Sequence, residues 1–177
     1  MPGEGGLTAP LNPAAPRTAK APLATSTTSW LWQLGRTDPS YAALVLRLTL
    51  AIVMFPHGAQ KLLGWFGGLG FSGTMAALTE TNGLPAVVAF LVIVIEFFGS
   101  IGLALGFLSR IAAAGIAAVM IGAVLTTHVQ VGFFMNWFGN QTGEGFEYHL
   151  LALGIALAVM IEGSGAISLD RMLSDRR

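Results

Sequence analysis

The chain has 177 residues, of which 54% are hydrophobic and only 10% are charged, and its formal net charge is zero. Because a soluble domain carries about 25% charged residues, most of this chain must face lipid or its own interior. The neutral balance, without a basic run, excludes a nucleic-acid partner bound through a basic surface. The absence of cysteine excludes disulfides, thiolate metal ligands and thiol redox chemistry within the chain.

The first segment, residues 1–38, is rich in Pro, Ala, Gly and Thr and has no apolar periodicity. That composition predicts a disordered tail, because too little apolar surface can be buried to offset the entropy of folding. A signal peptide needs an apolar run of about 7–15 residues, and none is present, so we expect the tail to be cytoplasmic. We expect residues 39–173 to form the membrane domain.

Four apolar stretches follow the tail, and each is expected to form a transmembrane helix. Asp38 and Pro39 predict the start of the first helix, and Pro56 predicts a kink inside it. The last apolar run is shorter than the ~20 residues that cross a bilayer, so its helix is expected to begin before Glu147. The expected spans are about residues 41–66, 84–108, 111–129 and 146–161.

The segments between and beside the spans indicate which side of the membrane each faces. Residues 71–80 are amphipathic and are expected to form a short helix on the outer surface, between the first two spans. Arg36, Arg110 and Arg171 lie near the opposite span ends, and basic residues favour the cytoplasmic side. The predicted fold is an all-α membrane protein, a four-transmembrane-helix bundle in the lipid bilayer with its N and C termini cytoplasmic.

Ionisable residues inside the spans are the candidates for a functional site. Placing such a residue at the bilayer centre costs at least ~2.5–3.5 kcal/mol, so those found there usually have a function. At ~100° per residue, Arg47, His57 and Lys61 fall within an arc of about 80° on one face of the first span. Glu96 lies near the middle of the second span, where we expect it to reach Arg47 or His57.

The third and fourth spans contribute residues near their outer ends. His128 lies at the end of the third span, and Glu147 and His149 lie at the start of the fourth. Residues two apart point to roughly opposite faces of a helix, so only one of the two can face the centre of the bundle, and we assign that place to Glu147. The predicted intramembrane polar site consists of Arg47, His57, Lys61, Glu96, His128 and Glu147.

Three interpretations of this polar site remain open. The charges could pair only to fix helix register, or they could form a pocket for an amphipathic molecule such as a quinone, with His and carboxylate groups exchanging protons. Alternatively, His57 and His128 could ligate a haem iron from facing helices. Di-iron bundles need Glu-x-x-His pairs, which are absent, so no metal ligand is assigned and haem or metal ranks below quinone. No nucleophile has a base at useful spacing, which leaves catalytic residues unknown.

The order of these residues resembles the DoxX family of small bacterial membrane proteins. The resemblance covers about residues 40–173 and combines short motifs that are specific only together. The matching elements are Arg47-Leu48, His57-Gly58-x-x-Lys61-Leu62, Glu96-Phe97-x-Gly99, Gly106 with Arg110, His128 with Gly132-Phe133-Phe134, Glu147-Tyr148, and Gly163-x-Gly165 with Ser168-Leu169-Asp170.

The resemblance implies a multi-pass four-helix bundle in the bacterial inner membrane. Members of the family are linked to thiosulfate oxidation with quinone as acceptor, or to complexes with superoxide dismutase and a sulfurtransferase. Since this chain has no cysteine to carry a persulfide, a stand-alone thiosulfate oxidoreductase is disfavoured.

We expect a DoxX-like membrane subunit that supports a membrane-associated redox system and binds quinone at the polar site. One alternative is a non-catalytic scaffold for redox or oxidative-stress enzymes, and another is a small-solute transporter. The expected partners are membrane or peripheral redox proteins, and the sequence leaves a homo-oligomer open.

Overall fold

The computed structural model describes residues 38–174, which form helices and connecting loops, with no strand in that range. Three of its helices are long and apolar enough to cross a membrane: 41–63, 86–105 and 109–128. Apart from Asp38, the predicted tail lies outside the described residues.

The first long helix, α2 (Tyr41–Leu63), begins and ends at identifiable caps. Ser40, rather than the expected Asp38, is the N-cap, and its hydroxyl accepts a hydrogen bond from the Ala43 N–H at 3.2 Å. The helix continues through Pro56 and stops earlier than Phe66, because Gly64 takes a left-handed conformation with φ of 73°. A short 3₁₀ turn, η1 (Trp65–Gly67), follows.

The next two apolar stretches are helical columns that contain a wider π-helical turn. The second consists of α4 (Ala86–Val94), the π turn η3 (Ile95–Gly99) and α5 (Ser100–Leu105). The third consists of α6 (Ser109–Ala123) and the π turn η4 (Val124–His128). Between the first two columns lie α3 (Gly70–Ala76) and a further π turn, η2 (Ala77–Thr81).

The last long helix, α7 (Glu147–Glu162), is the shortest of the four, with 16 residues. Our expectation that it begins before Glu147 is wrong, since Phe146 is its N-cap. The preceding residues form a loop held in place by side chains instead of extending the helix. The chain ends with α8 (Leu169–Ser174).

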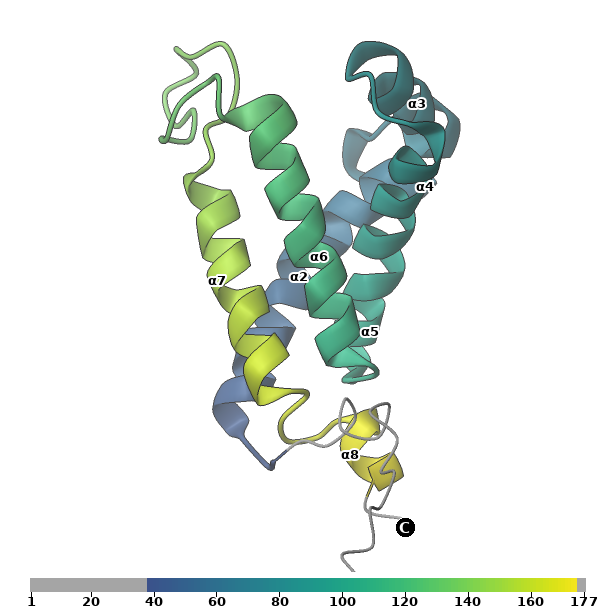
Figure 1. The fold of residues 1–177 in the computed structure, drawn as a ribbon, viewed down its shortest axis with the longest axis vertical. Helices are drawn as coiled ribbons and strands as arrows, with labels where there is room; N and C mark the ends of the chain where they lie inside the picture. Colours follow the sequence, from purple (N-terminus) through teal and green to yellow (C-terminus); the bar gives the residue numbers. More distant parts are fainter. Residues whose placement is uncertain (1–37, 175–177) are drawn as a thin grey trace, which may run out of the picture.

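The molecule widens toward one end. At what we call the open end, α3 and the loop of residues 129–146 lie on two separate arms, whereas at the closed end the α5–α6 turn lies beside α8 (Figure 1). The Ala166 N–H donates to the Ser40 carbonyl at 3.0 Å, so both ends of the described chain lie at the closed end.

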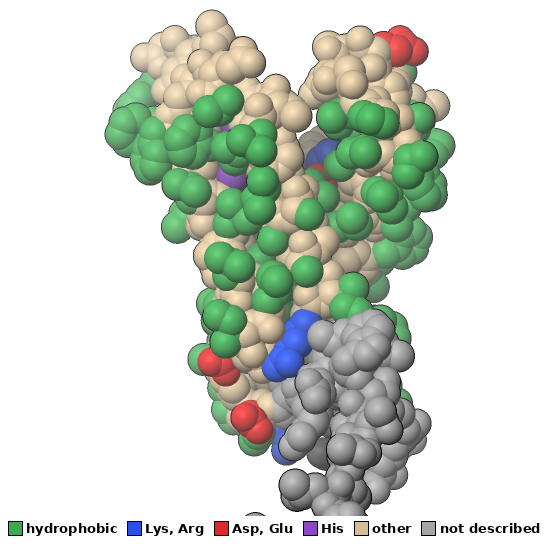
Figure 2. Space-filling view, viewed as in Figure 1, with side chains coloured by type: hydrophobic (Ala, Val, Ile, Leu, Met, Phe, Trp, Pro, Cys, Tyr) green, Lys and Arg blue, Asp and Glu red, His purple; other side chains and the backbone are tan. Residues whose placement is uncertain are grey.

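The hydrophobic core lies toward the closed end of the bundle. Exposed apolar side chains cover the outside of the bundle around it. Leu50, Met54, Leu103 and Ile116 are fully buried among small residues from α6 and α7. In contrast, apolar side chains such as Ile52, Val87 and Leu151 are at least 70% exposed. Figure 2 shows hydrophobic side chains over the outside of the bundle. Such an exterior is suited to a bilayer.

Arg47 is buried on α2 and stabilises the closed end through hydrogen bonds to backbone carbonyls. Its guanidinium donates to the carbonyls of Leu103 (2.6 Å) and Ala104 (2.7 Å) at the end of α5. It also donates to the carbonyls of Ser164 (2.8 Å) and Ile167 (2.6 Å) before α8. The Leu103 carbonyl also accepts from the Gly106 N–H at 3.1 Å, and the planar cation bonds several carbonyls at the ends of these segments at once.

Asp170 completes this closed end by capping α6. Its carboxylate accepts hydrogen bonds from the N–H groups of Leu108 (2.9 Å) and Ser109 (3.2 Å) and from the hydroxyl of Ser164. A carboxylate is favourable there because the start of a helix carries a partial positive charge.

Candidate ligand-binding site

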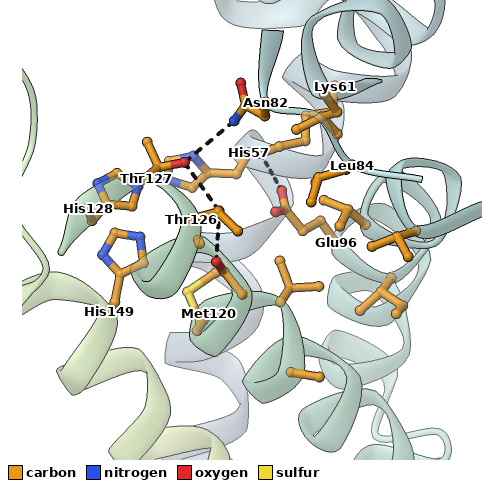
Figure 3. Close-up of a pocket in the computed structure, with 18 of the residues that line it drawn as sticks. His57, Lys61, Asn82, Leu84, Glu96, Met120, Thr126, Thr127, His128 and His149 are labelled. Carbon is orange, nitrogen blue, oxygen red and sulfur yellow. Dashed lines mark hydrogen bonds and ion pairs between the residues drawn. The ribbon is translucent and has the colours of Figure 1, made fainter. Parts of the chain in front are cut away.

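A cavity of about 530 Å³ lies between the two arms, toward the open end of the bundle. Figure 2 shows the notch between the arms, and Figure 3 shows the side chains that line the cavity. Small-molecule sites occupy about 300–1,000 Å³, are mostly apolar and contain a few converging polar groups. The apolar wall comes from Leu84, which precedes α4, and from Val88, Leu91, Val92 and Ile95 of the second column.

An ion pair lies on one wall of this cavity. Lys61 Nζ of α2 is 2.6 Å from Glu96 Oε2 of η3, and the two side chains are 27% and 4% exposed. We expected Glu96 to reach Arg47 or His57, but the structure pairs it with Lys61. The pair offers a ligand one cationic donor and one anionic acceptor.

Gly58 explains how these two helices approach closely enough for the pair. A Cβ atom on Gly58 would lie 2.6 Å from Phe97 Cα and 2.7 Å from the Glu96 carbonyl carbon. Only glycine lets the two backbones meet at this distance. The glycine one turn before Lys61 therefore sets the position of Glu96.

The three π turns all contribute to the cavity. η2 contributes Leu78, η3 contributes Glu96, and η4 contributes Thr126, Thr127 and His128. A π turn widens the helix by one residue and redirects its side chains, and such turns are frequent at functional sites. Across the opening, Asn82 Nδ2 donates to Thr127 Oγ1 at 3.4 Å, which links the two arms (Figure 3).

Two histidines form a close, tilted pair on the other wall. The rings of His128 and His149 have centroids 4.1 Å apart and an interplanar angle of 40°. His128 Nδ1 lies 2.8 Å from the carbonyl oxygen of Glu144. His149 is 6% exposed, and its Nδ1 has no hydrogen-bond partner among residues 38–174.

His57 lies between the ion pair and the histidine pair. Its ring centroid is 6.1 Å from that of Tyr148, which in turn lies 5.4 Å from His149. The Tyr148 hydroxyl donates to Met54 Sδ at 3.5 Å. All three histidines of the chain thus line one cavity.

The structure separates two of the predicted site residues from this cavity. Arg47 lies at the closed end, about 15 Å along α2 from His57 at ~1.5 Å per residue. Glu147 turns toward the loop, where its Oε1 accepts hydrogen bonds from Met135 N (3.0 Å) and Trp137 Nε1 (2.9 Å). His149 and Tyr148, not Glu147, line the cavity.

Metal ligation requires several donor groups at close range. Within the described residues, no three His, Asp or Glu side chains cluster closely enough to hold a metal ion. The polar groups of the cavity instead occupy separate walls, which suits an organic molecule with more than one polar atom.

Comparison with known proteins identifies the family of this chain. The model of the DoxX family matches residues 42–129. A protein of Bacillus subtilis (strain 168) named "Putative oxidoreductase CatD" is 32% identical over 127 residues, which span 72% of this chain and 83% of that protein. The chain belongs to the DoxX family. No solved structure matches it.

Two Escherichia coli (strain K12) proteins place this DoxX protein in the inner membrane. "Inner membrane protein YqjF" is 32% identical over 133 residues, spanning 75% of this chain and 92% of that protein. "Inner membrane protein YphA" is 27% identical over 131 residues, spanning 72% of this chain and 87% of that protein. Together with the apolar helices, these relatives show a multi-pass protein of the inner membrane.

The Gly58 contact gives a stability prediction for this DoxX protein. Gly58→Ala is expected to lower the free energy of unfolding by about 2 kcal/mol, because the new methyl group meets backbone atoms that cannot move independently. Thermal unfolding in detergent measures the change. The matched control is Gly154→Ala on α7, where nothing lies within 4 Å of an added Cβ. Equal stability of the two variants would contradict the close approach.

Proposed function

We propose that the cavity binds a quinone and that this DoxX protein is a quinone-binding subunit of a redox system in the inner membrane. The observation that carries the proposal is the Lys61–Glu96 ion pair on the wall of a mostly apolar cavity. A quinone combines an apolar ring and tail with polar oxygens, and this cavity offers a surface for each part. The similarity to the protein named "Putative oxidoreductase CatD" is consistent with this role.

The ion pair serves a quinone in both of its oxidation states. Lys61 donates a hydrogen bond to a carbonyl oxygen, and it stabilises negative charge that develops there on reduction. Glu96 accepts a hydrogen bond from a hydroxyl once the ring is reduced. His57, on the same face of α2, is placed to exchange a proton with the bound molecule. Electrons would pass to or from a partner protein, which supplies the redox group.

Titration of a soluble short-chain ubiquinone into the protein in lipid nanodiscs tests this proposal. We expect the wild type to bind and Glu96→Gln, which keeps shape but removes charge, to bind about tenfold more weakly, as a lost charged hydrogen bond implies. Thr126→Val is the control, because the Thr126 hydroxyl donates to the Gly122 carbonyl at 2.8 Å within its own helix. A wild type that binds no quinone would favour the scaffold instead.

We also propose that α7 is a fourth span and that residues 39–173 form one membrane domain. At ~1.5 Å per residue α7 is about 24 Å long, and the loop of residues 163–168 would complete the crossing. Its packing against α6 and α2 supports this placement. Arg110 and Arg171 lie at the closed end, so the positive-inside rule puts that end in the cytoplasm and α3 on the outer surface.

Single introduced cysteines test this topology, since the chain has none of its own. An impermeant maleimide added to intact cells is expected to label Asn140→Cys in the open-end loop. Ser174→Cys at the end of α8 is expected to react only after the membrane is permeabilised. The reverse pattern would place the closed end outside and overturn the proposed orientation.

A further inference from the structure

We infer that His128 and His149 form a second anchor for the bound molecule, so that the cavity selects a para-quinone, whose two oxygens lie at opposite ends of the ring. The inference rests on the proposed quinone-binding function and names the class of quinone. It is carried by the tautomers of the two histidines and by their position across the cavity from Lys61 and Glu96.

The hydrogen bonding of His128 fixes which of its nitrogens is free. The Glu144 carbonyl oxygen, 2.8 Å from His128 Nδ1, can only accept, so Nδ1 carries the proton. In the neutral ring Nε2 then holds a lone pair. His128 therefore offers the cavity a hydrogen-bond acceptor, and the Glu144 carbonyl orients its ring.

The burial of His149 indicates that its proton is on Nε2, whereas that of His128 is on Nδ1. Its Nδ1 is fully occluded and without a partner among residues 38–174. Buried N–H groups without a partner are rarer than buried lone pairs without one, so the proton belongs on Nε2. Because His149 lines the cavity, Nε2 is the ring nitrogen that can meet a ligand. It offers a donor where His128 offers an acceptor.

A hydrogen-bond donor beside a hydrogen-bond acceptor suits a quinone oxygen, which is a carbonyl when oxidised and a hydroxyl when reduced. The carbonyl oxygen of a quinone accepts from His149, and the hydroxyl of the corresponding quinol donates to His128. Lys61 and Glu96 present the same combination of donor and acceptor. The cavity therefore contains two such donor–acceptor pairs, which we call stations: Lys61 with Glu96, and His149 with His128. Each station can bind one quinone oxygen in either oxidation state.

The two stations lie on different walls. Lys61 and Glu96 come from α2 and η3, whereas His128 and His149 come from η4 and α7, and Figure 3 shows the two pairs on opposite sides of the cavity. A ring bound at both stations needs its oxygens at opposite ends. A para-quinone meets this requirement, and an ortho-quinone, with both oxygens on one side, engages only one station.

Titration of para- and ortho-naphthoquinone, two isomers of equal size, into nanodisc-embedded wild type and variants tests the inference. Intact mass of each sample reports any covalent adduct on lysine. We expect the wild type to bind the para isomer about tenfold more tightly, and His149→Phe to lose that preference by weakening para binding alone. His149→Gln, whose amide reaches the position of Nε2, should retain the preference, and His149→Asn, whose amide lies at Nδ1, should not.

The outcomes distinguish a failure of the second anchor from a failure of quinone binding itself. Equal binding of the two isomers by the wild type, or an unchanged preference in His149→Phe, would overturn the second anchor while leaving quinone binding at Lys61 and Glu96 intact. Binding of neither isomer would overturn the proposed function and this inference together. Melting temperatures of the variants in the same nanodiscs are expected to match the wild type, and a preference lost only alongside a lowered melting temperature counts against the anchor.

Discussion

Lys61→Met is expected to destabilise the protein by about 2 kcal/mol, because it leaves the Glu96 carboxylate buried without its partner. Glu96 is 4% exposed, so solvent cannot replace the lost ammonium group. Adding Glu96→Gln to the same chain removes the uncompensated charge and is expected to restore most of the stability. The measurement is thermal unfolding of the single and double variants in the same detergent.

The double variant separates a structural role of the ion pair from a functional one. We expect Lys61→Met/Glu96→Gln to fold like the wild type and yet to bind short-chain ubiquinone at least tenfold more weakly, since each lost charged contact is worth about 1.5–3 kcal/mol. If the stable double variant binds quinone with wild-type affinity, the pair serves only packing. If the double variant stays as unstable as Lys61→Met, the buried carboxylate is not the cause of the instability.

Arg47→Met is expected to have the largest effect on stability, a loss of about 4 kcal/mol, because it leaves several buried carbonyl oxygens without donors. The guanidinium joins the end of α5 to the segment before α8, and no single smaller group reaches both. Arg47→Lys keeps the charge but not the planar arrangement of donors, so we expect it to recover less than half of the loss.

The control for Arg47 is Arg171→Met on α8, which lies at the same end but is partly exposed. Its substitution should cost less than about 1 kcal/mol, as is usual for surface charges. Size-exclusion profiles of detergent extracts, recorded after heating, compare the three variants. A monodisperse Arg47→Met protein with wild-type heat resistance would show that the closed end does not depend on this side chain.

The course of the helices could be predicted from the sequence because the signals are local. Apolar runs broken by glycine and proline located α2 and the second and third columns to within a few residues. The exact caps depend on side-chain contacts, so Ser40 is the N-cap where the sequence predicts Asp38. Residues 129–146 are held by Glu144 and Glu147, which accept hydrogen bonds from backbone N–H groups within the loop itself, and no periodicity reports such contacts.

The candidate site was predictable in part. The face of α2 that carries His57 and Lys61 follows from helix geometry, and the cavity contains both together with Glu96 and His128. The pairing of Glu96 with Lys61 could not be derived, because it depends on the close approach at Gly58 and on the π turn that carries Glu96. An ideal spacing of 100° per residue does not include such a turn.

The sequence does not decide between Glu147 and His149, because it shows only that the two residues point to opposite faces of a helix. A helix that begins before Glu147 would place both residues inside the membrane. Instead Glu147 is the first helical residue, where a carboxylate can turn outward to the loop donors at Met135 and Trp137. His149, two residues later, faces the opposite side and enters the cavity. The position of the helix start therefore decides which of the two side chains enters the cavity.

Identification of the molecules that remain bound after purification tests the central claim most directly. The wild type and Lys61→Met/Glu96→Gln would be extracted from native membranes in mild detergent and recorded by native mass spectrometry, with organic extracts of each analysed for quinones. We predict a quinone that accompanies the wild type and is depleted in the double variant. A wild type that carries only phospholipid, or a quinone retained equally by both proteins, would contradict a quinone site at Lys61 and Glu96.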